Sequence, residues 1–143
     1  MLDSILLVDD ESLFQLVFED ACSLLDIALQ LVSVDSADTA EKLCQKWHSG
    51  ESKKPDCVFV DLNIVGSSVD GIELVRRINH IYGNGVVVGI ISSSSDKKEI
   101  EKAISAGAQF WIVKSDQIEP RLEKFRNDYS GFKNKTSVFK VYS

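Results

Sequence analysis

Three aspartates that lie at the ends of two short apolar runs have the clearest potential for chemistry in this sequence: Asp9, Asp10 and Asp61. Two like charges ~4 Å apart repel by roughly 4 kcal/mol at an effective dielectric of ~20, so a fold that gathers such carboxylates needs a compensating cation. Oxygen ligands with no His or Cys nearby suit Mg²⁺. A carboxylate can also attack phosphate to give an acyl phosphate. If the fold brings them together, these residues predict Mg²⁺-dependent phosphoryl transfer.

A hydroxyl and an ammonium group follow two further apolar runs. Ser92 comes directly after residues 86–91, and Lys114 comes directly after residues 110–113. Each residue alone has an ordinary structural explanation, because aspartates cap helices and turns, serines fill loops and lysines are usually solvated. The combination of three acids, a hydroxyl and a lysine favours a shared site. Asp35 also follows an apolar run, but at the expected sheet edge, and is assigned a surface or capping role.

The elements that must position these side chains are short apolar runs alternating with longer amphipathic segments. The runs are nearly continuous and rich in Val and Ile, as in strands buried on both faces of a parallel sheet. They cover residues 5–8, 29–34, 57–60, 86–91 and 110–113. Right-handed crossovers predict an α/β fold, a doubly wound five-stranded parallel sheet of order 2-1-3-4-5. Strands one and three are then neighbours, and the three aspartates meet beyond their carboxyl ends.

The intervening segments have helical spacing of apolar residues. In the first segment the predicted buried face consists of Leu13, Leu16, Val17, Ala21, Leu24 and Leu25. The later segments repeat this spacing within residues 40–47, 74–82, 100–104 and 122–129. Their ends are marked by expected N-caps at Ser36, Asp70 and Asp96 and by Gly107 after the fourth helix.

Composition bounds the class of protein. The chain has 143 residues, of which 44% are hydrophobic and 27% charged, which fits one globular domain. Its net charge of −6 argues against binding to nucleic acid or to an anionic membrane. No apolar run approaches the ~20 residues that span a bilayer. Cys22, Cys44 and Cys57 lie in apolar segments and predict buried, reduced thiols in a cytoplasmic protein.

Five motifs carry a resemblance to a known family, and they lie within residues 5–11, 58–63, 70–75, 88–92 and 107–114. Over roughly residues 3–129 the chain resembles a receiver domain of the response regulators of two-component signalling. The resemblance implies a stand-alone phosphorelay protein that is not an enzyme beyond its own Mg²⁺-dependent phosphorylation and dephosphorylation. The phosphoryl donor would be a sensor histidine kinase or a histidine phosphotransfer protein, and the output an unidentified protein partner.

The resemblance also implies a role for each site residue. Asp61 is the phosphoacceptor, Ser92 bonds a phosphoryl oxygen and Lys114 pairs with the phosphoryl charge. The Mg²⁺ site consists of the carboxylates of Asp10 and Asp61 and the backbone carbonyl of Asn63 as ligands, with Asp9 positioning the metal through water. Trp111 occupies the position of the aromatic switch, whose ring turns inward after phosphorylation. The surface of the fourth helix, fifth strand and fifth helix is then remodelled, and a homodimer through this face is a further expectation.

The sequence departs from the usual family pattern at several positions. Ser115 follows Lys114, where the family usually has a proline with a cis bond, and Trp111 replaces the commoner Tyr or Phe. The loop from residue 64 to 69 is longer than usual. These departures motivate an alternative, a receiver-like adaptor that binds partners without phosphorylation. A flavodoxin-like FMN carrier is a third hypothesis, disfavoured because the acids after the first strand would repel a phosphate without a metal.

The end of the chain is chemically distinct from the receiver domain, which is expected to occupy residues 1–129. The basic C-terminal tail, residues 130–143, carries Lys133, Lys135 and Lys140 and no acidic residue. Residues 138–142, which are apolar except for Lys140, leave three alternatives open: a short strand, an anchor, or an end that is not native to the protein.

Overall fold

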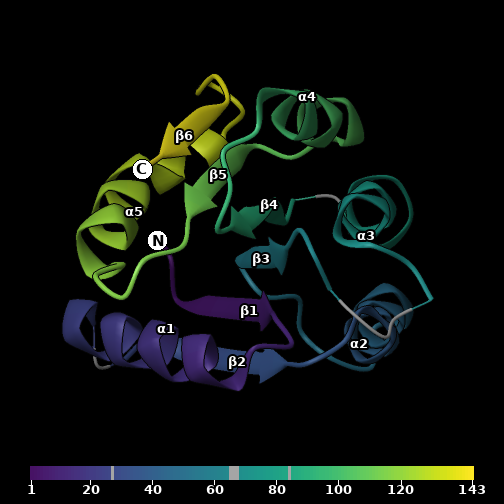
Figure 1. Ribbon diagram of the computed structural model, residues 1–143. Coiled ribbons are helices and arrows are strands. Elements are labelled where there is room, and N and C mark those ends of the chain that lie inside the picture. Colours follow the sequence, from purple (N-terminus) through teal and green to yellow (C-terminus); the bar gives the residue numbers. More distant parts are fainter. Residues whose placement is uncertain (27, 65–67, 84) are drawn as a thin grey trace.

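A parallel sheet with helices on both faces organises the chain (Figure 1). The computed structural model describes residues 1–26, 28–64, 68–83 and 85–143. In these residues six strands have the order β2-β1-β3-β4-β5-β6. Their bounds are β1 Ser4–Val8, β2 Gln30–Val34, β3 Cys57–Asp61, β4 Val87–Ser92, β5 Phe110–Val113 and β6 Lys140–Tyr142. The helices are α1 Ser12–Leu25, α2 Ala37–Ser49, α3 Gly71–Arg77, α4 Lys97–Ala106 and α5 Glu119–Lys133, with a π-helical turn η1 at Ile78–Tyr82.

The predicted α/β class and the strand order 2-1-3-4-5 are confirmed, with β6 added beside β5. The central strands β3 and β4 are buried along their whole length, which explains their continuous apolar sequences. Helices α1 and α5 cover one face of the sheet, and α2, α3 and α4 cover the other (Figure 1). Two apolar clusters separated by the sheet therefore form the core.

The predicted buried face of the first helix is partly wrong. Leu13, Leu16 and Leu24 are 72%, 59% and 71% exposed. The buried residues of α1 are instead Phe14, Phe18, Ala21 and Cys22. Two apolar stripes of helical spacing compete in this segment, and the stripe with the aromatic rings buries more apolar surface. Phe18 packs edge-on against Phe59 of β3, with ring centroids 5.1 Å apart.

The predicted helix caps are confirmed. The side chains of Ser36, Asp70 and Asp96 accept hydrogen bonds from backbone N–H groups in the first turns of α2, α3 and α4. Gly107 ends α4 with a φ of 100°, a left-handed conformation that favours glycine. The third helix differs from the prediction, because after Arg77 it continues as η1, closed by a bond from Gly83 N–H to the Ile78 carbonyl at 3.0 Å.

The C-terminal tail contributes to the sheet. Helix α5 continues to Lys133, past the expected domain end at residue 129, and the chain then returns as β6 in parallel to β5. A short strand, one of the alternatives left open for residues 138–142, is present at Lys140–Tyr142.

The three cysteines are buried and unpaired, as predicted. Burial raises the pKa of both Cys22 and Cys44 to about 12, and it also raises the pKa of Cys57 well above its ordinary value. We therefore expect the native protein to react with Ellman's reagent at least about 100-fold more slowly than an exposed thiol, since the thiolate is the reactive form. All three thiols should react at once in denaturant. A fast native reaction would contradict the packing of the two apolar clusters.

Within the described ranges, no helix has the length and apolar character required to cross a bilayer.

Candidate functional site

The three sequence-predicted aspartates meet at one end of the sheet. Strands β1 and β3 pair in parallel with Val8 opposite Val60, so Asp9, Asp10 and Asp61 leave the sheet side by side. One carboxylate oxygen from each lies within 4.8 Å of the others. Asp9 is fully buried and Asp61 is buried, whereas Asp10 is exposed. The end of the sheet is therefore an acidic pocket open on the side of Asp10.

Local hydrogen bonds hold the first carboxylate in place. Oδ1 of Asp9 accepts from the backbone N–H of Glu11 at 2.8 Å. The backbone N–H of Asp9 donates to the Val34 carbonyl at 3.0 Å. The Gln15 amide of α1 donates to the Asp9 carbonyl at 2.5 Å. Both the end of β1 and the start of α1 thus fix the direction of the Asp9 side chain.

Lys114, at the end of β5, reaches into the acidic pocket. Its Nζ lies 2.8 Å from Oδ2 of Asp9 and 3.3 Å from Oδ2 of Asp61. The ammonium group also lies 4.7 Å from the ring centroid of Phe14, close enough for a cation–π interaction. The Lys114 backbone N–H donates to the Ser92 carbonyl at 2.7 Å, which ties the ends of β4 and β5 together. The lysine therefore supplies positive charge that faces the clustered acids.

The charges in this pocket are strongly coupled. Burial raises the pKa of Asp61 above its ordinary value, the nearby Asp9 raises it further, and Lys114 only partly offsets both. Burial acts to lower the pKa of Lys114, but the two carboxylates outweigh it and the net pKa is raised. The metal-free pocket thus carries more negative charge than Lys114 alone can compensate.

The residues present fit a hard divalent cation. Oδ2 of Asp9 is buried and has the Lys114 ammonium group as an ion-pair partner at 2.8 Å. This one cation faces three clustered carboxylates, so negative charge is left over in the pocket. The available donors are carboxylate oxygens, which favour Mg²⁺ over softer metals. The donor set and the excess of negative charge therefore agree with a metal at this point.

Gly71 lets α3 begin directly against the strand that carries Asp61. A Cβ at this position would lie 2.3 Å from the Asp61 carbonyl oxygen and 3.0 Å from that of Leu62. We expect Gly71→Ala to reduce the free energy of unfolding by about 1–3 kcal/mol, because rigid backbone must move to relieve the clash. Denaturant unfolding would measure this loss.

Gly83→Ala is the matched control for that substitution. Its added Cβ would lie 3.2 Å from a methyl group of Val86, a side chain that can shift. Its backbone φ of −161° is ordinary extended geometry. An equal loss of stability in both variants would contradict a specific backbone contact at Gly71.

Ser92 and Trp111 lie on the adjacent strands β4 and β5. The buried Ser92 hydroxyl accepts from the backbone N–H of Ser94 at 3.1 Å. Trp111 is fully buried, and its indole Nε1–H donates to the Ser94 carbonyl at 2.9 Å. The indole therefore lies inside this structure, in the apolar cluster that also contains Ala103 and Ala106 of α4. The role of Trp111 as an aromatic switch stays a prediction.

Three further features singled out in the sequence are Asn63, the Lys114–Ser115 peptide bond and the loop from residue 64 to 69. The backbone N–H of Asn63 donates to Oδ1 of Asp61 at 3.3 Å, which keeps Asn63 beside the acidic pocket. The Lys114–Ser115 bond is trans, as are the other peptide bonds of the described residues. The longer loop from residue 64 to 69 includes residues 65–67, which lie outside the described residues.

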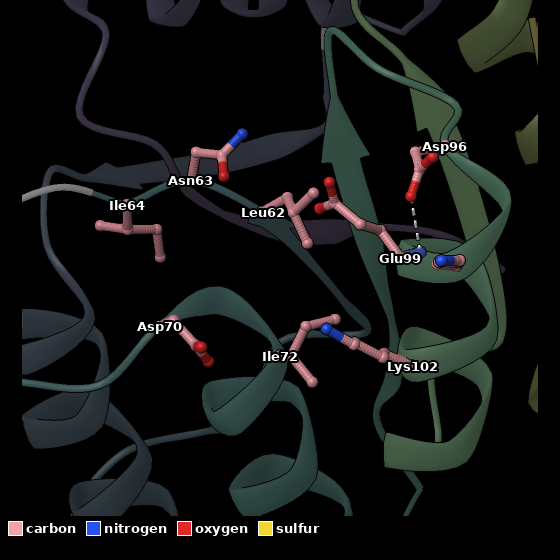
Figure 2. Close-up of a pocket in the computed structure, with 9 residues that line it drawn as sticks. Leu62, Asn63, Ile64, Asp70, Ile72, Asp96, Glu99 and Lys102 are labelled. Carbon is pink, nitrogen blue, oxygen red and sulfur yellow. Dashed lines mark hydrogen bonds between the residues drawn. The ribbon is translucent and has the colours of Figure 1, made fainter.

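A cavity of about 620 Å³ borders the site between the loop after β3, α3 and α4. Figure 2 shows Glu99 and Lys102 extending from α4 toward Leu62 and Ile72 on the opposite wall. Asn63, two residues after Asp61 in the sequence, is one of the residues that line this cavity. Its lining mixes acids, lysines and aliphatic side chains.

Sequence reasoning missed two contributors to the site. Phe14 supports the Lys114 ammonium group, and Ser94 connects Ser92 to Trp111 through its backbone. The spacing of Phe14, Phe18 and Cys22 was a usable signal for the first, because it marks a second helical stripe. No sequence signal identifies Ser94, since it acts through its backbone groups.

The chain belongs to the response regulator receiver domain family, whose profile matches residues 5–124. Receiver domains of this family are signalling modules of two-component systems. A comparison with curated protein sequences found no match.

Solved structures show the same fold. A CheY-like receiver domain protein from Methanospirillum hungatei has a TM-score of 0.75 at 16% identity, over 94% of this chain and 99% of that chain. The phosphorylated cyanobacterial phytochrome response regulator RcpA has a TM-score of 0.73 at 16% identity, covering 96% and 98% of the two chains. The Mn²⁺-bound response regulator Rcp1 has a TM-score of 0.70 at 16% identity, covering 95% and 98%.

Proposed function

We propose that this receiver domain accepts a phosphoryl group on Asp61 in a Mg²⁺-dependent reaction and thereby changes a surface that binds a partner. The observation that carries the proposal is the meeting of Asp9, Asp10 and Asp61 within 4.8 Å, with Lys114 beside two of them. Such a cluster is costly unless a cation and a charged substrate use it. Neutralising phosphoryl oxygens with a metal and a lysine is the recurring arrangement for phosphoryl transfer.

Each residue has a defined task in this proposal. The Asp61 carboxylate is the nucleophile, and its position beside Lys114 lets the ammonium group pair with the phosphoryl charge that arrives. Ser92 offers its hydroxyl proton to a phosphoryl oxygen. Asp9, Asp10, Asp61 and the Asn63 carbonyl would hold Mg²⁺. When bound, the metal supplies charge neutralisation that Lys114 alone does not provide.

The phosphoryl donor is proposed to be a sensor histidine kinase or a histidine phosphotransfer protein, as in two-component systems. One structural relative is named as phosphorylated and another as bound to Mn²⁺, which supports both parts of the proposal. The adaptor that ignores phosphorylation is not favoured, because all the residues needed for acceptor chemistry are present. The Ser115 departure removes none of them.

Incubation with acetyl phosphate and Mg²⁺, followed by intact mass analysis, tests the proposal. We expect wild-type protein to gain the mass of one phosphoryl group and Asp61→Ala to gain none, since the nucleophile is missing. Omission of Mg²⁺ should reduce the yield by at least about tenfold. Asp35→Ala, at the corresponding end of the edge strand β2, should behave as wild type. Equal labelling of wild type and Asp61→Ala would refute the proposal.

A further inference from the structure

The end of the chain is fastened along the outer edge of the sheet. We call residues 136–142 the tail strap. Its strand β6 pairs with β5 in parallel, with Trp111 opposite Val141 and Ile112 opposite Tyr142 (Figure 1). The Lys140 ammonium group lies 3.3 Å from Oδ2 of Asp128 on α5, and the Tyr142 hydroxyl donates to the same oxygen at 2.7 Å. One carboxylate of α5 therefore holds two side chains of the strap.

Only a few residues of the strap pack against the rest of the protein, and they do so on both faces of the sheet. Tyr142 is buried and meets Phe125 of α5 edge-on, with ring centroids 6.0 Å apart. On the opposite face, Phe139 packs against the core cluster that contains Trp111. Val138 and Val141 remain 76% and 44% exposed. A three-residue edge strand with such partial burial belongs to the least stable part of a fold, which opens most readily.

A continuous path connects the strap to the acidic pocket. The Ser92 hydroxyl, at the end of β4 beside Asp61, accepts from the backbone N–H of Ser94. The Ser94 carbonyl accepts from the indole of Trp111. Trp111 in turn is the β5 residue opposite Val141 in the strap. A displacement of Ser92 can therefore be transmitted to the strap through Ser94 and the side chain of Trp111.

We propose that the tail strap is the element that phosphorylation regulates: it covers the edge of β5 while Asp61 is unmodified and detaches once Asp61 carries a phosphoryl group. This inference rests on the proposed function of Asp61. A phosphoryl oxygen that accepts the Ser92 hydroxyl proton draws this side chain toward Asp61, away from the Ser94 N–H that donates to the Ser92 oxygen, so the loop after β4 loses an anchor. Movement of Ser94 removes the acceptor of the Trp111 indole and loosens the packing that supports Phe139. Detachment uncovers the β5 edge, which lies in the face of α4, β5 and α5.

Hydrogen exchange of Trp111→Phe tests the coupling without any phosphorylation. Phenylalanine keeps an aromatic ring in the core but cannot donate to the Ser94 carbonyl. We expect the amides of residues 140–142 to exchange at least tenfold faster than in wild type, while those of β1 keep their rate. Trp47→Phe, the same change at the other tryptophan, should leave strap exchange unchanged. Unchanged exchange in Trp111→Phe, or equal acceleration in β1, overturns the coupling.

Beryllofluoride with Mg²⁺ tests the regulation itself. We expect the strap amides of wild type to exchange at least tenfold faster with this phosphoryl mimic, and those of Asp61→Ala not to respond.

Intact mass analysis with acetyl phosphate records separately whether Asp61 is modified. Modification without faster strap exchange overturns this inference and leaves the proposed function standing. Absence of modification refutes the proposed function and with it the regulation, whatever Trp111→Phe shows.

Discussion

Mg²⁺ should raise the melting temperature of the wild-type protein by several degrees and leave that of Asp10→Asn unchanged. Binding to the folded state alone stabilises it by about 1.4 kcal/mol at a concentration ten times the Kd, which corresponds to about 3–6 °C for a chain of this size. Without metal, Asp10→Asn should melt about 2 °C above wild type, because one of three clustered negative charges is removed. Thermal unfolding followed by circular dichroism, with and without Mg²⁺, measures both effects.

Asp35→Asn is the matched control for the metal response. Asp35 is exposed and follows the edge strand β2, outside the cluster of carboxylates. The variant loses the same charge and should keep the full response to Mg²⁺. If Asp10→Asn responded to Mg²⁺ as wild type does, the ion would be binding elsewhere and the acidic pocket would have no role in it.

Removal of the Lys114 charge should have the largest effect on stability. The ammonium group is 11% exposed and lies between two buried carboxylates, at 2.8 Å from Asp9 and 3.3 Å from Asp61. Loss of one partner from a buried charge group typically costs about 3–5 kcal/mol, because the remaining charges are left uncompensated. We therefore expect Lys114→Met, which keeps most of the side-chain volume, to reduce the free energy of unfolding by about 3 kcal/mol in metal-free buffer. Denaturant unfolding gives this value directly.

Mg²⁺ distinguishes an electrostatic cause of that loss from a packing defect. A metal ion can replace the missing positive charge, so Lys114→Met should gain more stability from Mg²⁺ than wild type does. Lys102→Met, an exposed lysine of α4, should change stability by less than about 0.5 kcal/mol. A large loss in Lys114→Met that Mg²⁺ did not reduce would mean that packing against Phe14 is the main contribution of Lys114.

The sheet and most of the candidate site were predictable from the sequence, because buried parallel strands have a recognisable pattern of apolar residues. Each central strand is a continuous apolar run, and the first polar residue after it marks the end where ligands bind. Asp9, Asp61, Ser92 and Lys114 all occupy such positions, so the strand order alone brought them to one end of the sheet. The capping side chains of Ser36, Asp70 and Asp96 were equally visible, since capping is a local interaction.

Features decided by competition between similar packings were not predictable. Helix α1 contains two apolar stripes, and only the fit of Phe18 against Phe59 decides which one is buried. The inward position of Trp111 depends on a backbone carbonyl of Ser94, which no side-chain pattern reports. The tail became a sixth strand because β5 would otherwise be an unpaired edge and because Asp128 binds Lys140 and Tyr142. Each of these outcomes depends on contacts between residues far apart in the sequence or on backbone groups.

A crystal structure grown with Mg²⁺ and beryllofluoride tests most directly whether the aspartates form a phosphoacceptor site. We predict one metal ion in contact with the carboxylates of Asp10 and Asp61, and the beryllofluoride group on Asp61 with Lys114 and Ser92 as its neighbours. An ordered structure under these conditions with neither the ion nor the beryllofluoride among these residues would contradict the assignment of Asp61 as the phosphoacceptor.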